Sequence, residues 1–136
     1  RSSISFFGEQ VSPLVYITHP RNNDDTIASF RPHNNAVGTS GDYQQYFEYE
    51  GQRYHHIIDA KSGYPVPNVF SVTVIHPSAA WADGLATALF LMLPEQAMDY
   101  VTKRSDTNCV IYYLQDEGIV SLKSNGMKNL EFQENL

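Results

Sequence analysis

In residues 53–66, RYHHIIDAKSGYPV, two histidines and an aspartate precede a Ser-Gly turn. On a strand, His55 and His56 point to opposite faces, so they cannot bind one ligand together, and one of them is expected in solvent. His56 lies near Asp59 and has the chemistry of a proton carrier, because a carboxylate can fix the tautomer of an imidazole. A hydrogen-bonded structural histidine is the alternative.

Asp83 and Thr87 interrupt an apolar segment that is predicted to form a helix over residues 79–93. They are four residues apart and share the one narrow polar stripe of a helix that is otherwise apolar almost all round, which indicates burial. The residues leave two interpretations open. Asp83 is either a hydrogen-bonded structural acid, with Thr87 donating to the carbonyl four residues back, or part of a hard-cation site to which both contribute oxygens.

The stretch TSGDY, residues 39–43, combines a hydroxyl, a glycine and an acid. Gly41 would let a ligand approach the backbone, flanked by the Ser40 hydroxyl and the Asp42 carboxylate. An ordinary turn held by the hydroxyl is the alternative. The sequence has no G-x-S-x-G, G-x-x-x-x-G-K-[ST], H-E-x-x-H or G-x-G-x-x-G motif, so serine hydrolase, P-loop, zincin and Rossmann chemistry have no support.

Composition and charge narrow the classes of protein further. The 136 residues carry a net charge of -6, and their nine Lys and Arg are scattered, which argues against a nucleic-acid partner. No apolar run approaches the roughly 20 residues of a membrane span, and no signal or anchor is seen. The single cysteine, Cys109, lies among apolar residues and is predicted to be a buried strand thiol.

Hydrophobic periodicity and turn formers predict an α+β fold, with two consecutive helices packed on an antiparallel sheet in a layered sandwich. In the strand at 68–77, Val69, Ser71, Thr73 and Ile75 should share one face and Phe70, Val72 and Val74 the other. The first helix starts after the N-cap Ser78. The other predicted elements are a strand at 13–18, a hairpin of 43–49 and 52–58 around Glu50-Gly51, a helix at 94–104, a hairpin around Glu117-Gly118, and a tail with a short turn and an edge strand.

Four segments taken in order resemble the C-terminal part of the ApbE family, the FAD:protein FMN transferases. They are TSGDYQQYF, YHHIIDAKSGYPV, SVTVIHPSAAWADGLATALFLM and CVIYYLQDEG, and the resemblance covers about residues 35–125. Family members carry S-G-D-Y/E, H-I-I-D-P-[RK]-[TS]-G-x-P, and an S-V-T-V strand leading to A-D-x-[LA]-[AS]-T-A. Ala60 replaces the family's proline, while Lys61 and Ser62 keep a charge and a hydroxyl.

This resemblance implies a T-fold-like domain and a Mg²⁺-dependent transfer of FMN from FAD to a Thr or Ser hydroxyl of an acceptor protein, with release of AMP. It implies that Asp83 and Thr87 bind Mg²⁺, and that His56 acts as general base or contacts the phosphates. The expected flavin-contacting or site-shaping residues are Ser40, Gly41, Asp42, His56 and Asp59.

We expect one domain over residues 1–136, with 1–30 matching the family poorly. Two alternatives stay open: a non-catalytic flavin-binding or protein-binding module without the family's N-terminal lobe, and a Mg²⁺-dependent FAD pyrophosphatase that uses water as acceptor. The expected partners are FAD, an acceptor protein, and a homo-oligomer or a second chain that completes the site. The resemblance also implies a bacterial protein of the cell envelope.

Overall fold

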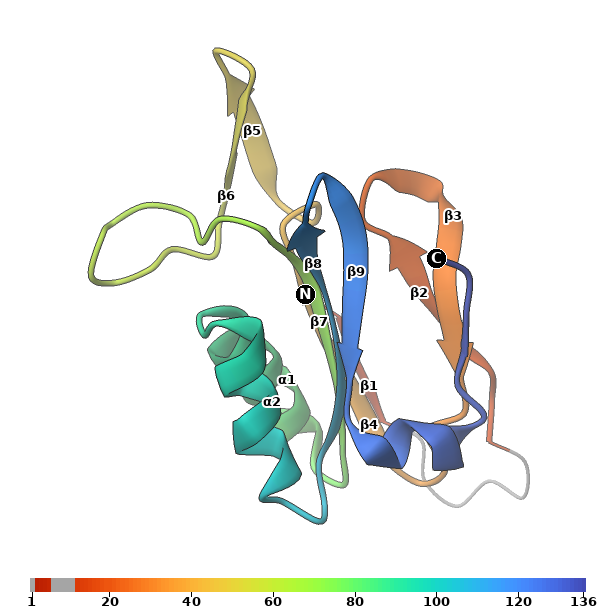
Figure 1. The fold of residues 1–136 in the computed structure, drawn as a ribbon. Coiled ribbons are helices and arrows are strands. Elements are labelled where there is room, and N and C mark those ends of the chain that lie inside the picture. Colours follow the sequence, from red (N-terminus) through yellow and green to blue (C-terminus); the bar gives the residue numbers. More distant parts are fainter. Residues whose placement is uncertain (1, 6–11) are drawn as a thin grey trace.

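The computed structural model describes residues 2–5 and 12–136 and is built around a five-stranded antiparallel sheet (Figure 1). Its strands follow the spatial order β1-β4-β7-β8-β9. They comprise β1 (Ser2–Ser5), β4 (Ala36–Gly41), β7 (Val69–His76), β8 (Asn108–Gln115) and β9 (Gly118–Lys123).

Both helices, α1 (Ala79–Phe90) and α2 (Pro94–Thr102), cover one face of this sheet. The opposite face is covered by a smaller sheet in the order β10-β3-β2, formed by β10 (Gln133–Glu134), β3 (Asn22–Phe30) and β2 (Val15–His19). A 3-10 helix, η1 (Asn125–Leu130), precedes β10, and the hairpin of β5 (Tyr46–Tyr49) and β6 (Gln52–His55) projects beyond the layers. The α+β prediction, with two consecutive helices on an antiparallel sheet, is confirmed.

Short-range features of the sequence correctly predicted the start of one helix and the position of one hairpin turn. Ser78 is the N-cap of α1 and its side chain accepts from the Trp81 amide, although the helix ends at Phe90 rather than at residue 93. Glu50 and Gly51 both have positive φ, as a tight two-residue hairpin requires. In the β8–β9 hairpin the positive φ values fall one residue earlier than predicted, at Asp116 and Glu117. Cys109 is fully buried on β8, as predicted.

Three strands escaped prediction. The polar run after β2 is rich in residues that favour turns, yet it is the first half of β3, which pairs with β2 through irregular register. Residues 22–26 of that strand are exposed, and only its second half enters the core. Strand β4 was missed because its small residues resemble a turn, and β1 pairs along its outer edge. Pairing with neighbours overrode weak local propensity in each case.

Burial also corrects two expectations about faces. Helix α1 is buried on one side only, because Trp81 on its outer side remains 60% exposed. In β7, Val69 joins the core under the helices, whereas Phe70 and Ile75 face the other core. The register shift between Val69 and Ser71 inserts one extra residue, which turns the start of the strand over.

Candidate functional site

His55 and His56 end the same hairpin, but only His55 lies inside the molecule. The residue is 7% exposed. Its Nε2 donates to the Val66 carbonyl at 3.0 Å, and its Nδ1 accepts from the Ile57 amide at 3.3 Å. The ring also packs edge-on against Phe90 of α1, with 5.6 Å between centroids. Sequence reasoning did not single out this residue.

His56 is the solvent-facing member of the pair. Its backbone amide donates to the Gln45 carbonyl at 3.1 Å, and its Nδ1 donates to the same carbonyl at 3.2 Å. A carbonyl oxygen only accepts, so this contact places a proton on Nδ1, and in the neutral ring the lone pair is then on Nε2. That tautomer leaves Nε2 as the basic atom of an exposed imidazole.

Asp59 organises the turn that follows the histidines. Its carboxylate accepts from the amides of Lys61 at 3.1 Å and Ser62 at 3.2 Å. The Lys61 amide, followed by the Ser62 side chain, lowers the pKa of the Asp59 carboxyl. Gly63 adopts a φ of 71° and donates to the Asp59 carbonyl, so the Ser-Gly turn closes on this acid.

The second group of predicted residues meets where α1 crosses β4. The hydroxyls of Ser40 on β4 and Thr87 on α1 are 3.1 Å apart, although 47 residues separate them in the chain. Asp83 is half-buried one helical turn before Thr87. Gly38 makes this approach possible, because a Cβ there would lie 2.6 Å from the Ala82 carbonyl carbon.

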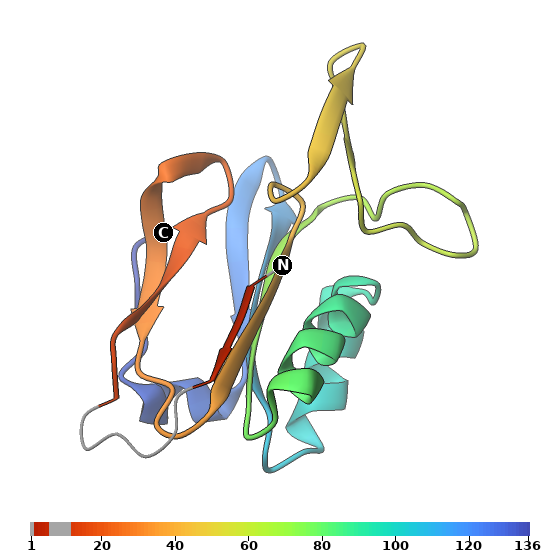
Figure 2. The same ribbon diagram turned by 180° about the vertical axis from the view of Figure 1, so that it is seen from behind.

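Contacts with α1 connect the two groups. Phe90, against which His55 packs, follows Thr87 by three residues on the same helix. The loop after β6 therefore starts beside the C-terminal end of α1, and both ribbon views show it extending beyond that end of the helix (Figures 1 and 2). The structure thus attaches the histidine loop and the Ser40–Thr87 contact to one helix.

In this structure Asp42 forms a buried ion pair, and Gly41 leaves space for a neighbouring side chain. The Asp42 carboxylate is 4% exposed and forms a two-point ion pair with Arg21, at 2.9 and 2.7 Å. The Arg21 guanidinium also stacks on Phe70, 3.8 Å from the ring centre. The space beside Gly41 holds the Tyr43 ring, which a Cβ would approach to 2.6 Å. Contact of either residue with flavin stays a prediction.

The side chains fit Mg²⁺ as a partial site. A carboxylate and a hydroxyl at i and i+4 on α1, with the Ser40 hydroxyl beside them, are the hard oxygen donors that this ion prefers. Within the described residues, no group of three or more His, Cys, Asp or Glu side chains could hold a metal ion. Phosphate oxygens and waters would have to complete the coordination.

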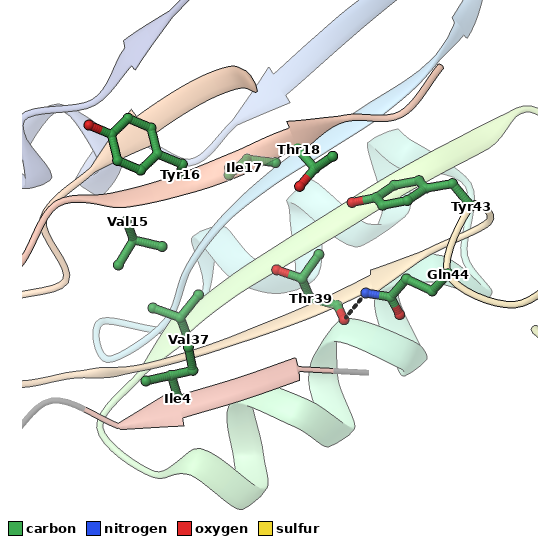
Figure 3. Close-up of a pocket in the computed structure, with 9 residues that line it drawn as sticks. All are labelled: Ile4, Val15, Tyr16, Ile17, Thr18, Val37, Thr39, Tyr43 and Gln44. Atoms are coloured by element: carbon green, nitrogen blue, oxygen red, sulfur yellow. Dashed lines mark hydrogen bonds between the residues drawn. The ribbon is translucent and has the colours of Figure 1, made fainter. Parts of the chain in front are cut away.

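A cavity of about 360 Å³ lies on the other face of the main sheet, between β2 and β4 (Figure 3). Thr18, Thr39, Tyr43 and Gln44 supply its polar lining. None of the predicted site residues lines this cavity, so the cavity and the candidate site are separate features.

Comparison with known proteins identifies the family. The model of the ApbE family matches residues 3–111. This chain belongs to the ApbE family. The match begins well before the segments that carry the sequence motifs.

Relatives in the ApbE family include the FAD:protein FMN transferase of Vibrio cholerae, 42% identical over 98 residues, and that of Haemophilus influenzae, 38% identical over 100 residues. Each alignment covers 71% of this chain but only 29% and 28% of the respective relative. The chain therefore spans less than a third of the length of these bacterial transferases.

Solved structures agree with the assignment of this chain to the ApbE family. The ApbE protein of Thermotoga maritima has a TM-score of 0.84 and 32% identity, covering 95% of this chain and 42% of its own. The Vibrio cholerae flavin transferase ApbE has a TM-score of 0.78 and 32% identity, covering 94% and 41%. No helix in the described part of this chain is long and apolar enough to cross a membrane.

Proposed function

We propose that residues 1–136 form one domain, the C-terminal part of an FAD:protein FMN transferase. One observation carries this proposal: the Ser40 hydroxyl on β4 meets that of Thr87 at 3.1 Å. Thr87 lies one turn from Asp83 on α1, the helix that His55 at the start of the histidine loop also contacts. Oxygen donors on α1 and β4, together with a loop that starts at α1 and carries the exposed imidazole of His56, suit phosphoryl transfer, which depends on positioning and charge neutralisation.

In the proposed reaction, the Ser or Thr hydroxyl of an acceptor protein attacks the flavin-side phosphorus of FAD. A phosphoester bond forms, the bond from that phosphorus to the bridging oxygen breaks, and AMP leaves with the bridging oxygen. The hydroxyl proton passes to Nε2 of His56, whose Nδ1 proton is held by the Gln45 carbonyl. Asp83 and Thr87 would hold Mg²⁺, which would supply positive charge to neutralise the transferred phosphoryl group.

Ser40 and Asp59 have supporting roles in this proposal. The Ser40 hydroxyl orients that of Thr87, because the two share a hydrogen bond. Asp59 shapes the loop that approaches the pyrophosphate, through its contacts with the Lys61 and Ser62 amides. The name of the bacterial relatives supports a partner set of FAD and an acceptor protein. A location in the cell envelope is proposed from the family resemblance alone. A second chain or further segment would complete the FAD pocket, since the relatives are longer.

Flavin transfer can be tested with the chain itself and with a chimera. The chimera carries residues 1–136 in place of the aligned part of the Vibrio cholerae enzyme. Each is incubated with FAD, MgCl₂ and an acceptor protein that this enzyme flavinylates. In-gel flavin fluorescence measures transfer, and chromatography measures AMP and FMN.

We expect Asp83→Ala to reduce transfer on the order of 10²-fold or more, because charge on the phosphate would no longer be neutralised. Asp99→Ala is the matched control, since Asp99 is an exposed acid on α2 paired only with Lys103 in the contacts described. Binding of FAD without transfer in the chimera would contradict the proposal and indicate a binding module. Release of FMN and AMP with acceptor present but unlabelled would indicate a pyrophosphatase.

A further inference from the structure

The buried histidine has both ring nitrogens occupied by the backbone of the loop that it begins. Nε2 of His55 donates to the Val66 carbonyl, at the far end of the loop, and Nδ1 accepts from the Ile57 amide at its near end. These contacts require a proton on Nε2 and a lone pair on Nδ1, which is one neutral tautomer. A ring with both nitrogens committed in this way is not available for proton transfer.

The same ring ties the loop to helix α1. His55 meets Phe90 at an interplanar angle of 73°, and Phe90 is fully buried in the core under the helices. Ile57 and Val66, the residues that His55 contacts through the backbone, pack on that core as well. The two ends of the loop are therefore held together, and both are held on the core to which the helix that carries Asp83 and Thr87 contributes.

In the chain, His56 lies between the buried His55 and Ile57, whose amide donates to His55. Its own amide and Nδ1 both donate to the Gln45 carbonyl, so its ring orientation depends on where its backbone lies. That backbone is bounded on one side by the buried His55 and on the other by Ile57, whose amide His55 holds.

We propose that His55 is the positioning residue of the transferase site: it fixes the loop 56–66 on α1, so that His56 presents Nε2 in one orientation relative to Thr87. This inference rests on the proposed role of His56 in flavin transfer. His55 acts through the backbone and through Phe90, without contact to the reacting atoms. An error of about 1 Å in the placement of a catalytic group can reduce a rate on the order of 10²-fold.

Three variants separate the contacts of His55. His55→Asn retains an oxygen that can accept from the Ile57 amide but loses the donor to Val66. His55→Gln retains a nitrogen that can donate to the Val66 carbonyl. His55→Phe retains the packing on Phe90 and loses both hydrogen bonds, so it is the variant that tests positioning apart from ring packing.

The first measurement needs no activity. In the ¹⁵N-labelled chain, NMR of the imidazole nitrogens should show the Nδ1–H tautomer at His56 in the native protein and a mixture of tautomers in His55→Phe. Exchange of the Ile57 amide proton should become at least about tenfold faster in His55→Phe and return toward the native rate in His55→Asn. An unchanged His56 tautomer in a folded His55→Phe would overturn the proposal.

The second measurement uses the chimera. His55→Phe should lower kcat for flavin transfer on the order of 10- to 100-fold while KM for FAD changes less than about twofold. His55→Asn and His55→Gln should recover part of kcat. A kcat that follows only the folded fraction across the three variants would reduce His55 to a structural residue. If the native chimera transfers no flavin, the proposed function fails, and the NMR result still decides whether His55 controls His56.

Discussion

At the residue scale, each acid of the family motifs has a distinct environment. Asp42 is buried and neutralised by Arg21, because a buried carboxylate without a partner is strongly unfavourable. Asp59 accepts backbone amides in a solvent-accessible turn. Asp83 is half-buried on α1, beside the Thr87–Ser40 contact. Residue type alone does not distinguish these three roles, because the surroundings of each carboxylate determine its role.

The depressed pKa of Asp59 gives a testable pH dependence. The turn at 59–64 should be retained at neutral pH and lost as the pH falls through the pKa of Asp59, which the amide contacts of the folded loop hold below its ordinary value of 3.8. Amide chemical shifts of Lys61 and Ser62 between about pH 6 and pH 2 measure this change.

Two controls make this pH prediction specific. The Cys109 amide, which donates to Ser124 in the core, reports whether the whole domain remains folded during the titration. Asp59→Asn should remove the transition in the loop, because the amide does not ionise in this range. Loop amides that titrate above pH 5 in the native protein would be inconsistent with a lowered pKa.

At the element scale, the site depends on how closely α1 approaches β4. Gly38 lies under the backbone of Ala82 and Asp83, where a Cβ would come within 2.6 to 2.8 Å of main-chain atoms. Backbone atoms cannot rotate away as a flexible side chain can. Any larger residue at this position must therefore push the helix away from the strand, and with it Thr87 away from Ser40.

Gly38→Ala should destabilise the domain by about 2 to 4 kcal/mol, because overpacking against a rigid backbone forces the helix to shift. Gly84→Ala is the matched control on the same helix, since a Cβ at Gly84 meets nothing within 4 Å. It should stabilise the domain by about 0.5 to 1 kcal/mol through reduced backbone entropy of the unfolded chain. Urea unfolding followed by circular dichroism measures both, and equal effects would refute the close-packing argument.

At the scale of the whole molecule, the central strands serve two cores. Cys109 and Ile111 of β8 face the core under the helices, while Val110 and Tyr112 face the core under β2 and β3. Alternation along one strand makes each core depend on the other. The layers should therefore unfold together.

Ile27→Ala tests this coupling from the side away from the site. Ile27 is a fully buried residue of β3, and its truncation should reduce stability by about 2 to 5 kcal/mol. Trp81 is the single tryptophan of the chain and lies on α1, in the helical layer. Its fluorescence should report the same shift in unfolding midpoint as far-UV circular dichroism. Separate transitions by the two probes would show that the layers are independent.

The sequence by itself determined the local features of this protein. Ser78 predicted the start of α1, Gly51 predicted a hairpin turn, and ordered motifs predicted the family, because caps, turns and motifs depend on residues near one another in the chain. The antiparallel sheet with two helices followed from hydrophobic periodicity. The polar half of β3 and the small residues of β4 carried no such local signal.

Only the tertiary structure decided which residues share the candidate site. It brought the Ser40 hydroxyl to that of Thr87 and paired Asp42 with Arg21. It also buried His55 and left His56 exposed to solvent. The alternation of a strand predicts that neighbouring histidines point apart, but it does not say which one meets the core. That choice depends on Phe90, which is distant in the sequence and reaches His55 only when the helices pack on the sheet.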